Sequence, residues 1–301
     1  MFYLAPSPLQ TICHPILAEN NIRLSLKRDD LLHPDISGNK WRKMKYNLIE
    51  AQQQNFTSLV TFGGAFSNHI YATAAAGKVF GFETYGIVRG DELNEQSSTT
   101  LSFAASCGMK MFFVSRTAYR DKAATLNSLV EEYPFLANSY YLPEGGSNHL
   151  AIKGVAEMVE EIYLETQPDY ITSAVGTGGT IAGIAAASRT NTQVIGFLAL
   201  KGAGGIQQDI HDLLTQNGYI MPPSFGLMST YHFGGYAKHN AQLWDFIHDF
   251  EKYNPSVRLE QVYTGKMLFG IFDLIQKGYF LPNSHIVAIH TGGLQGRILG
   301  K

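Results

Sequence analysis

Short apolar segments alternate with longer segments of helical periodicity along most of the chain. Several of the short segments are apolar throughout, as expected for strands of a parallel sheet that is covered on both faces. We predict strands at residues 22–26, 58–62, 84–88, 110–114, 171–175, 193–198 and 286–290. We predict helices at residues 40–54, 68–80, 99–107, 118–132, 149–165, 180–188, 207–216, 242–252 and 267–277. The alternation predicts an α/β protein with parallel sheets.

The composition indicates a folded protein that binds neither nucleic acid nor a membrane. The 301 residues suffice for two domains, and 45% of them are hydrophobic against 16% charged, which excludes a disordered chain. The formal net charge is −2 and the basic clusters are short, whereas nucleic-acid binding needs a clustered basic face. One long uncharged stretch, residues 170–188, contains four glycines and several threonines and serines. It is therefore a strand, a turn and a helix, not a membrane span.

The N-terminus and the cysteines favour a cytoplasmic location. The N-terminus has no positively charged segment and contains two early prolines, so it is not a signal peptide. Cys13 and Cys107 lie far apart in the sequence, and no CxxC motif is present. This usage indicates neither a disulfide framework nor a metal site. We predict two reduced thiols in a reducing compartment.

Lys40 is the first candidate for chemistry. It lies in the motif SGNKWRKMKYNL at residues 37–48, where Asn39 is placed to cap a helix. The positive end of the helix dipole and the neighbouring Arg42 and Lys43 all disfavour the ammonium form of Lys40. A neutral amine is what Schiff-base chemistry needs. The alternative is a solvated basic helix start of the kind common on protein surfaces.

The motif GTGGT at residues 176–180 directly follows a predicted strand and directly precedes an Ala/Ile-rich helix. Its glycines allow successive backbone N–H groups to converge, and the helix N-terminus adds a partial positive charge. The hydroxyls of Thr177 and Thr180 are further donors. This arrangement suits a phosphate, although it is neither a Walker loop nor a GxGxxG fingerprint. The alternative is a tight glycine turn.

The motif GGAFSNH at residues 63–69 also stands between a strand and a helix. Ser67 is at the cap position, where free backbone N–H groups are able to hold a substrate carboxylate. Asn68 or His69 is placed to reach a ring hydroxyl of a ligand. The alternative is an ordinary helix cap after a glycine turn.

Two tyrosine motifs and a glycine turn complete the candidates. Tyr236 ends FGGY at 233–236, and Tyr263 lies in VYTGK at 262–266. Each tyrosine is either an acid–base group or a packing residue. The motif HTGG at 290–293 ends the last predicted strand, at the sheet edge where ligands gather in open α/β folds.

The order of these motifs resembles that of the fold type II pyridoxal-phosphate enzymes. More narrowly, the chain is similar to the family of D-cysteine desulfhydrase and 1-aminocyclopropane-1-carboxylate (ACC) deaminase, from about residue 27 to residue 293. The resemblance implies two α/β domains with pyridoxal 5'-phosphate in the cleft between them. The larger domain would combine residues 1–43 with residues 151–301, and the smaller would be residues 44–150. The Pro-Glu-Gly-Gly segment at 143–146 suits a crossing between domains.

The resemblance also implies which residues bind the cofactor. Lys40 would be the Schiff-base lysine, and Lys43 would lie near the phosphate. Asn68 would hold the phenolic oxygen of the ring, and Thr264 would face its pyridine nitrogen. The phosphate would be bound by the GTGGT residues, namely Gly176, Thr177, Gly178, Gly179 and Thr180.

The implied activity is β-elimination on a small amino acid, most similar to D-cysteine desulfhydrase. Ser67 would hold the substrate carboxylate, while Tyr236 and Tyr263 would flank the substrate and, with Lys40, form the catalytic group. A β-leaving group such as thiolate would depart, and a keto acid and ammonia would be released. In ACC deaminases a glutamate follows the tyrosine of this motif, so Thr264 favours β-elimination. A homodimer is the assembly that the family implies.

Four alternatives stay open at this point. The first is ACC deaminase, and the second is a dehydratase of a hydroxy amino acid. The third is a non-catalytic protein that binds pyridoxal phosphate or another phosphate, and the fourth is an α/β enzyme that binds a nucleotide or a sugar phosphate through GTGGT alone. The chain departs from the family pattern in its short N-terminal segment, at Trp41, after Tyr236, and before Tyr263, where the usual Asp-Pro is absent. These positions surround the substrate more than the cofactor, so the sequence leaves the identity of the amino acid open.

Overall fold

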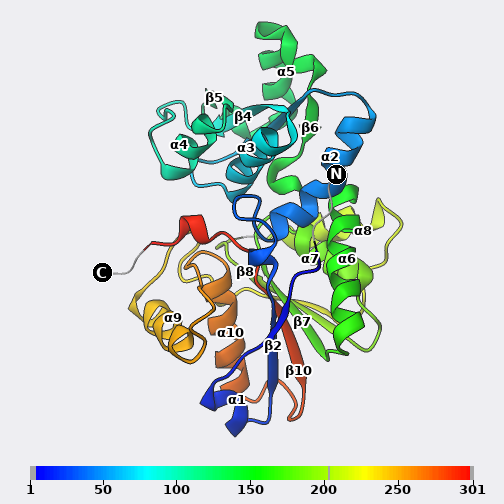
Figure 1. Cartoon of the computed structure of the whole chain (residues 1–301), viewed down its shortest axis with the longest axis vertical. Coiled ribbons are helices and arrows are strands. Elements are labelled where there is room, and N and C mark those ends of the chain that lie inside the picture. Colours follow the sequence, from blue (N-terminus) through cyan, green and yellow to red (C-terminus); the bar gives the residue numbers. More distant parts are fainter. Residues whose placement is uncertain (1–4, 203, 299–301) are drawn as a thin grey trace.

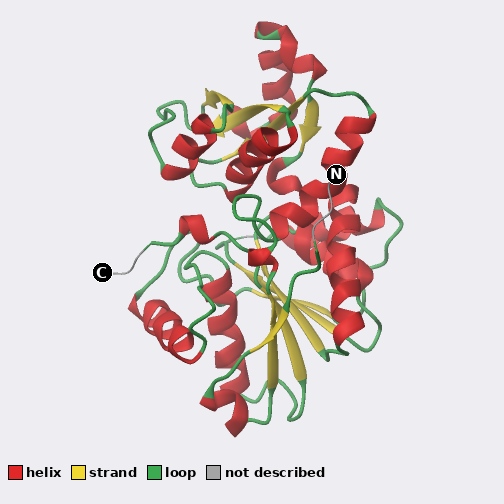
Figure 2. Ribbon diagram, viewed as in Figure 1, coloured by secondary structure: helices red, strands yellow, loops and turns green. Residues whose placement is uncertain are grey.

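The fold has one mostly parallel sheet and one fully parallel sheet, each covered by helices on both faces (Figures 1 and 2). The computed structural model describes residues 5–202 and 204–298. The six-stranded sheet has the order β1-β2-β10-β7-β8-β9, and the four-stranded sheet has the order β5-β4-β3-β6. The N-terminal end of helix α2 (Asn39–Gln53) lies at the level between the two sheets in Figure 1.

The larger sheet combines both ends of the described chain. Strand β1 is antiparallel to β2, and the remaining neighbours are parallel. Its strands are β1 (Leu9–Thr11), β2 (Arg23–Lys27), β7 (Tyr170–Val175), β8 (Gln193–Leu198), β9 (Phe225–Met228) and β10 (His285–Ile289).

Apolar residues on both faces of this sheet enter two separate cores. In β10, Ile286 and Ala288 pack with helices α1 (Pro15–Glu19), α9 (Ala241–Tyr253) and α10 (Thr264–Gln276). The alternate residues Val287 and Ile289 pack on the opposite face. That face is covered by three helices, α6 (His149–Glu165), α7 (Gly179–Ala187) and α8 (Ile206–Thr215). This double burial explains why the strand segments are apolar throughout.

The smaller sheet is parallel at every pairing. Its strands are β3 (Ser58–Gly63), β4 (Glu83–Arg89), β5 (Lys110–Val114) and β6 (Tyr140–Leu142). Its covering helices are α2 together with α3 (Asn68–Phe80), α4 (Thr99–Ser106) and α5 (Lys122–Glu132). Helix α5 packs against Val60 and Phe62, whereas α3 and α4 pack against Val88 on the other face.

The predicted strands and helices are all present, which confirms the α/β fold class with parallel sheets. The predicted helix 118–132 is divided into a short 3₁₀ turn, Ala118–Arg120, and α5. Helix α10 begins three residues earlier than predicted, at Thr264, because Glu260 caps its N-terminus. The short strands β1, β6 and β9 and the helix α1 were not predicted. The domain division stays a prediction, and its first boundary, after Lys43, falls within α2.

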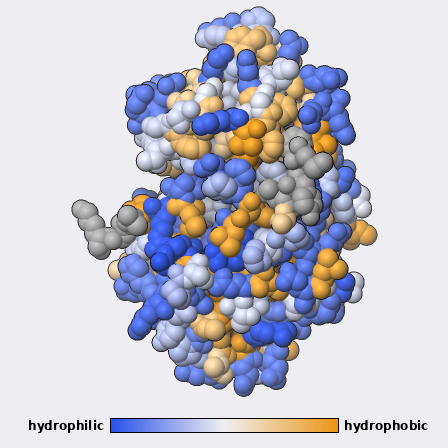
Figure 3. Space-filling model, in the orientation of Figure 1, coloured by the Kyte–Doolittle hydropathy of each residue, from blue (hydrophilic) through white to orange (hydrophobic). Residues whose placement is uncertain are grey.

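The surface is mostly polar on the face drawn in Figure 3, with apolar residues in small separate groups. The most exposed large apolar side chains belong to Leu164, Ile220 and Leu281, which come from different parts of the chain. In the part of the chain that the structure describes, no helix is both long and apolar enough to cross a bilayer.

Candidate active site

A cavity of about 360 Å³ lies at the carboxyl ends of the strands of both sheets. Binding pockets for small molecules have this size, and in open α/β sheets they lie at this edge. The loops after β3, β6 and β7 and the start of α2 contribute to its wall. The lining includes nearly all of the predicted site residues, namely Lys40, Lys43, Ser67, Asn68, Gly176, Thr177, Gly178, Gly179, Thr180, Tyr236 and Tyr263.

The first turn of α2 is held against two other parts of the wall. Gly38 caps the helix with φ 64°, and a Cβ at this position would lie 2.0 Å from the carbonyl oxygen of Thr291. Only glycine allows this approach. Asn39, which we predicted as the cap, is instead the first helical residue. Its side-chain amide donates to Thr180 Oγ1 at 2.7 Å, which joins α2 to the 176–180 loop.

Lys40 and Lys43 are one helical turn apart and both line the cavity. Burial lowers the pKa of Lys40 to about 8. Burial, and then the charge of Lys40, lowers the pKa of Lys43 well below its usual value. The Lys43 ammonium donates to the carbonyl of Gly145, in the loop after β6. The structure therefore provides, at Lys40, an amine that is more easily deprotonated than an ordinary lysine, as predicted. The cause is burial and not the neighbouring Lys43, whose hydrogen bond raises the pKa of Lys40.

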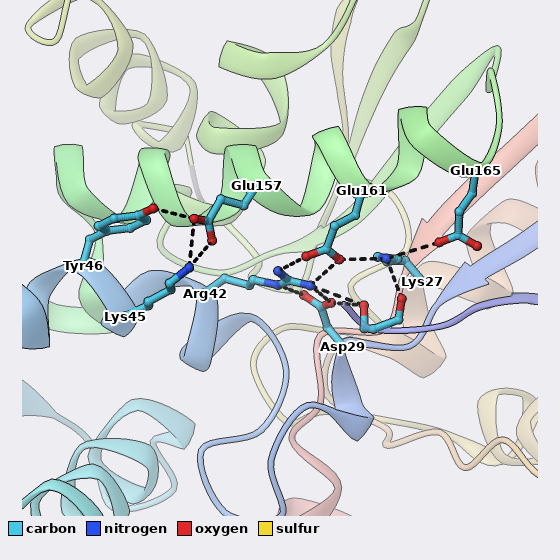
Figure 4. Close-up of polar contacts among 9 residues, drawn as sticks. Lys27, Asp29, Arg42, Lys45, Tyr46, Glu157, Glu161 and Glu165 are labelled. Carbon is cyan, nitrogen blue, oxygen red and sulfur yellow. Dashed lines mark hydrogen bonds and ion pairs between the residues drawn. The ribbon is translucent and has the colours of Figure 1, made fainter. Parts of the chain in front are cut away.

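A mostly buried ion-pair network joins α2 to α6 (Figure 4). The Arg42 guanidinium donates to both oxygens of Glu161, at 2.6 and 2.8 Å, and to both oxygens of Asp29, at 3.2 and 3.0 Å. Lys27 donates to Glu161 as well, at 2.8 Å. Burial opposes ionisation of Glu161, but Arg42 and Lys27 outweigh it and lower the pKa of that carboxyl. The network sets the orientation from which Lys40 and Lys43 reach the cavity.

The 176–180 loop forms a second part of the wall and leads into α7. Gly178 caps α7 with φ 81°, and a Cβ there would meet Ile210 at 2.7 Å. A Cβ at Gly179 would meet the Ser147 hydroxyl at 2.5 Å. That hydroxyl also pairs with Thr177 Oγ1 at 2.8 Å. Small residues, a helix N-terminus, hydroxyls and the nearby Lys43 ammonium together make a site suited to an anion.

The loop before α3 supplies the third wall. The Ser67 hydroxyl caps α3 and accepts from the backbone N–H groups of His69 and Ile70, at 3.2 and 3.3 Å. Ser67 is thus an ordinary helix cap and a cavity residue at the same time. Asn68 lines the cavity, and its side-chain oxygen accepts from Gln295 at 3.0 Å. His69 is buried and pairs with Thr61, whereas its Nδ1 has no hydrogen-bond partner among the described residues.

Tyr236 and Tyr263 lie side by side at the cavity, with ring centroids 6.2 Å apart. The Tyr236 hydroxyl donates to the carbonyl of Phe66 at 3.1 Å, across to the smaller sheet's side. A Cβ at Gly176 would lie 3.3 Å from the Tyr263 ring. Burial raises the pKa of both phenols, and each also feels the charge of Glu260. Both tyrosines are therefore neutral at physiological pH.

Thr264 does not line the cavity. It is fully buried as the first residue of α10, and its hydroxyl donates to Glu260 Oε1 at 3.0 Å. The Glu260 carboxylate also accepts the backbone N–H groups of Val262, Tyr263 and Thr264. In the structure the Thr264 hydroxyl is bonded to Glu260 and does not reach the cavity. Its predicted contact with the pyridine nitrogen of a cofactor therefore stays a prediction.

Several contributors to the site were not predicted. Arg89, at the end of β4, and Glu144 line the cavity, and the Glu144 carboxylate accepts from Tyr119 at 2.7 Å. Glu260 shapes the segment of Tyr263 from outside the lining. No usual capping pattern in the sequence marks it, because capping carboxylates stand at the N-cap or three residues after it, whereas Glu260 stands before Tyr263, the N-cap of α10.

Comparison with known proteins identifies the family. The model of the pyridoxal-phosphate dependent enzymes matches residues 3–292. This chain belongs to the pyridoxal-phosphate dependent enzyme family. Its cofactor is therefore pyridoxal phosphate, as the motif order indicated.

The relatives narrow the resemblance within this family. A bifunctional mitochondrial D-cysteine desulfhydrase/ACC deaminase of Arabidopsis thaliana is 29% identical, over 97% of this chain and 77% of its own length. A putative ACC deaminase of Pyrococcus abyssi is 27% identical, over 93% of this chain and 87% of its own. The crystal structure of an ACC deaminase homologue superposes with a TM-score of 0.84 at 25% identity, over 98% and 92% of the two chains. These matches confirm the fold type II architecture.

The side chains at the cavity fit this cofactor. Lys40 is a partly exposed amine with a lowered pKa, and the 176–180 loop with Lys43 offers an anion site on one wall. On another wall, the unpaired Nδ1 of His69 and the amide of Asn68 are polar groups that are able to bind the ring of the cofactor. The fit requires no metal, and the described residues contain no cluster of side chains arranged to bind one.

Proposed function

We propose that this enzyme catalyses β-elimination on a small amino acid, as D-cysteine desulfhydrase does, and releases a keto acid and ammonia. The observation that carries the proposal is one cavity that combines Lys40, the Ser67–Asn68 loop and the 176–180 loop. The names of the relatives support this reaction class, since desulfhydrase and deaminase are both among them.

The cofactor would be held at both ends. Lys40 would bind it covalently, because its neutral amine is accessible near pH 8. Gly176, Thr177, Gly178, Gly179 and Thr180 would bind the phosphate with the start of α7, and Lys43 would balance its charge. Asn68 would hold the phenolic oxygen. When bound, the cofactor supplies the electron sink that makes the α-proton of an amino acid acidic.

The substrate would be oriented by groups on two walls. Ser67 and the backbone N–H of Asn68, at the start of α3, would hold its carboxylate. Tyr236 and Tyr263 would flank it, and their neutral hydroxyls are able to donate to a developing thiolate. Lys40 would move the α-proton, because its amine lines the same cavity and burial lowers its pKa to about 8.

The residue at 264 favours elimination over opening of a cyclopropane ring. Thr264 carries no charge and is bonded to Glu260, so no carboxylate enters the cavity from this position. The chain thus lacks, at this position, the group that would keep the ring nitrogen protonated. A good leaving group compensates for a weaker electron sink. ACC deamination is the second candidate, because the relatives include enzymes with that name.

A substrate panel tests the proposal. The purified holoenzyme is incubated with D-cysteine, L-cysteine, β-chloro-D-alanine, D-serine and ACC, and keto acid, ammonia and sulfide are measured. We expect sulfide and pyruvate from D-cysteine and little product from ACC. ACC turnover equal to or above D-cysteine turnover would make the enzyme a deaminase. Turnover of D-serine alone would make it a dehydratase, and a spectral change without any product would indicate a binding protein.

We also propose an assembly and a location. A homodimer is proposed from the family, and light scattering of the purified protein tests it. A cytoplasmic location is proposed because Cys13 and Cys107 are both free, as expected in a reducing compartment.

A further inference from the structure

The loop that carries Tyr236 has an unusual backbone. Phe233 and Ala237 have φ values of 53° and 54°, and Gly234 and Gly235 between them have 95° and 127°. Residues with a Cβ rarely adopt these left-handed backbone angles. Such a conformation persists only where the surrounding structure holds it. The loop therefore needs an anchor.

Lys266 provides that anchor from the first turn of α10. Its side chain is buried, with 2% of the residue exposed. The ammonium donates to the carbonyl of His232 at 2.9 Å and to the carbonyl of Gly235 at 2.8 Å. These two carbonyls flank the left-handed Phe233 and Gly234. Among the described residues no carboxylate forms an ion pair with Lys266, so the loop carbonyls are what compensates its burial.

The anchored loop places Tyr236 in the cavity. Gly235, whose carbonyl Lys266 binds, directly precedes Tyr236, and the Tyr236 hydroxyl reaches Phe66 at 3.1 Å on the opposite wall. Tyr263 stands three residues before Lys266, at the N-terminus of the same helix. The start of α10 thus does two things: it places Tyr263 at the cavity, and through Lys266 it holds the loop that carries Tyr236. The motifs VYTGK and FGGY, which the sequence shows as separate, are one unit.

We propose that Lys266 is a positioning residue that holds Tyr236 against the substrate through the carbonyls of His232 and Gly235. The inference rests on the proposed function in one respect, namely that Tyr236 flanks the substrate. Lys266 itself does not line the cavity, so it acts through the loop. Burial lowers the pKa of Lys266 to about 8, which is consistent with an ammonium that has no carboxylate partner.

Lys266→Met tests the proposal, because methionine fills the space of the lysine stem without a donor. Lys277→Met is the matched control, since Lys277 ends the same helix but is exposed and pairs with Asp273. Lys266→Arg restores a cation with donors for both carbonyls, and Lys266→Gln replaces Lys266→Met if that variant does not fold. Each is prepared as holoenzyme, and its cofactor absorbance is compared with the wild type before any assay.

Two readouts separate positioning from general damage. The first is tryptic cleavage after Lys238, an exposed residue of the loop. We expect Lys266→Met to raise its rate about tenfold or more, and Lys277→Met and Lys266→Arg to leave it near the wild type. This readout needs no turnover. Unchanged cleavage in Lys266→Met overturns the proposal, whatever the enzyme's substrate.

The second readout is a double-mutant cycle on the best substrate of the panel. Lys266→Met should lower kcat/KM about tenfold or more in the wild type, but about twofold or less in a Tyr236→Ala background, where no tyrosine is left to position. Equal losses in both backgrounds would show a structural role and contradict the proposal. If no amino acid of the panel is turned over, the shift of cofactor absorbance on adding D-cysteine replaces kcat/KM. In that case the proposed function is wrong, whereas the rate of tryptic cleavage still decides the proposal for Lys266.

Discussion

Replacing Arg42 tests how strongly the buried network holds the helix of Lys40. Arg42 is 4% exposed and donates to two carboxylates, of which Asp29 is completely buried. In Arg42→Met, Glu161 keeps Lys27 as a partner, but Asp29 keeps only the Ser7 hydroxyl at 2.6 Å among the described side chains. A buried carboxylate thus loses its counter-charge.

Removing one partner of a buried ion pair costs about 3–5 kcal/mol. We therefore expect Arg42→Met to lower the free energy of unfolding by about 4 kcal/mol, toward the middle of that range. Lys45→Met is the control on the same helix, because Lys45 pairs with Glu157 in a partly exposed pair, with 19% and 30% of the two side chains exposed. Exposed pairs contribute about 1 kcal/mol or less.

Urea unfolding at neutral pH, followed by circular dichroism, measures both variants. The Arg42→Met holoenzyme should also lose cofactor affinity, because α2 carries Lys40 and Lys43 into the cavity. A cost below about 1 kcal/mol for Arg42→Met, equal to that of Lys45→Met, would refute the reasoning and make the network a surface feature in energetic terms.

Three further predictions concern the cavity and the segments that form its wall. Gly38→Ala should unfold the protein or abolish cofactor binding, because its Cβ would lie 2.0 Å from the carbonyl oxygen of Thr291. The control is Gly278→Ala, which has a similar φ of 68° but open space around it. In a melting experiment this control should lose only about 1–2 kcal/mol of unfolding free energy. Gly176→Asp, next to Tyr263, should weaken cofactor binding about a hundredfold in an absorbance titration, because a carboxylate would enter the proposed phosphate site. The control Gly204→Asp, where the glycine has open space around it, should leave cofactor binding unchanged. In the apoprotein, the rate of Lys40 acylation should increase with pH along a titration curve whose midpoint lies near pH 8. The reason is that only the neutral amine reacts and that burial lowers the pKa of Lys40 to about 8. A midpoint above pH 10 would contradict the lowered pKa.

The sequence predicted best where one local pattern decides the structure. Helices α3 and α6 begin and end where predicted, because Ser67 and Asn148 are good caps and because the apolar residues of α6 recur at helical spacing. Strand β6 is only three residues long, which is too short for a period to be recognised. The earlier start of α10 depends on the Glu260 side chain, which the pattern of apolar residues does not register.

The composition of the cavity was predictable from motif order, but its contacts were not. Lys40, Ser67, the 176–180 loop and Tyr263 meet because parallel strands bring their carboxyl ends together. The bond from Asn39 to Thr180 joins residues 141 positions apart. Thr264 was assigned to the cavity by its place in the motif alone, and the direction of its side chain follows from the cap that Glu260 provides. Such directions depend on tertiary packing that no local pattern contains.

The most direct test of the central claim is to locate the covalent attachment of the cofactor. Borohydride reduction of the holoenzyme, followed by peptide mapping, should find the pyridoxyl group on Lys40. Lys40→Ala should give no such adduct and no turnover on any amino acid, while the phosphate site still binds the cofactor weakly. An adduct on Lys43, or on no lysine of this cavity, would contradict the account.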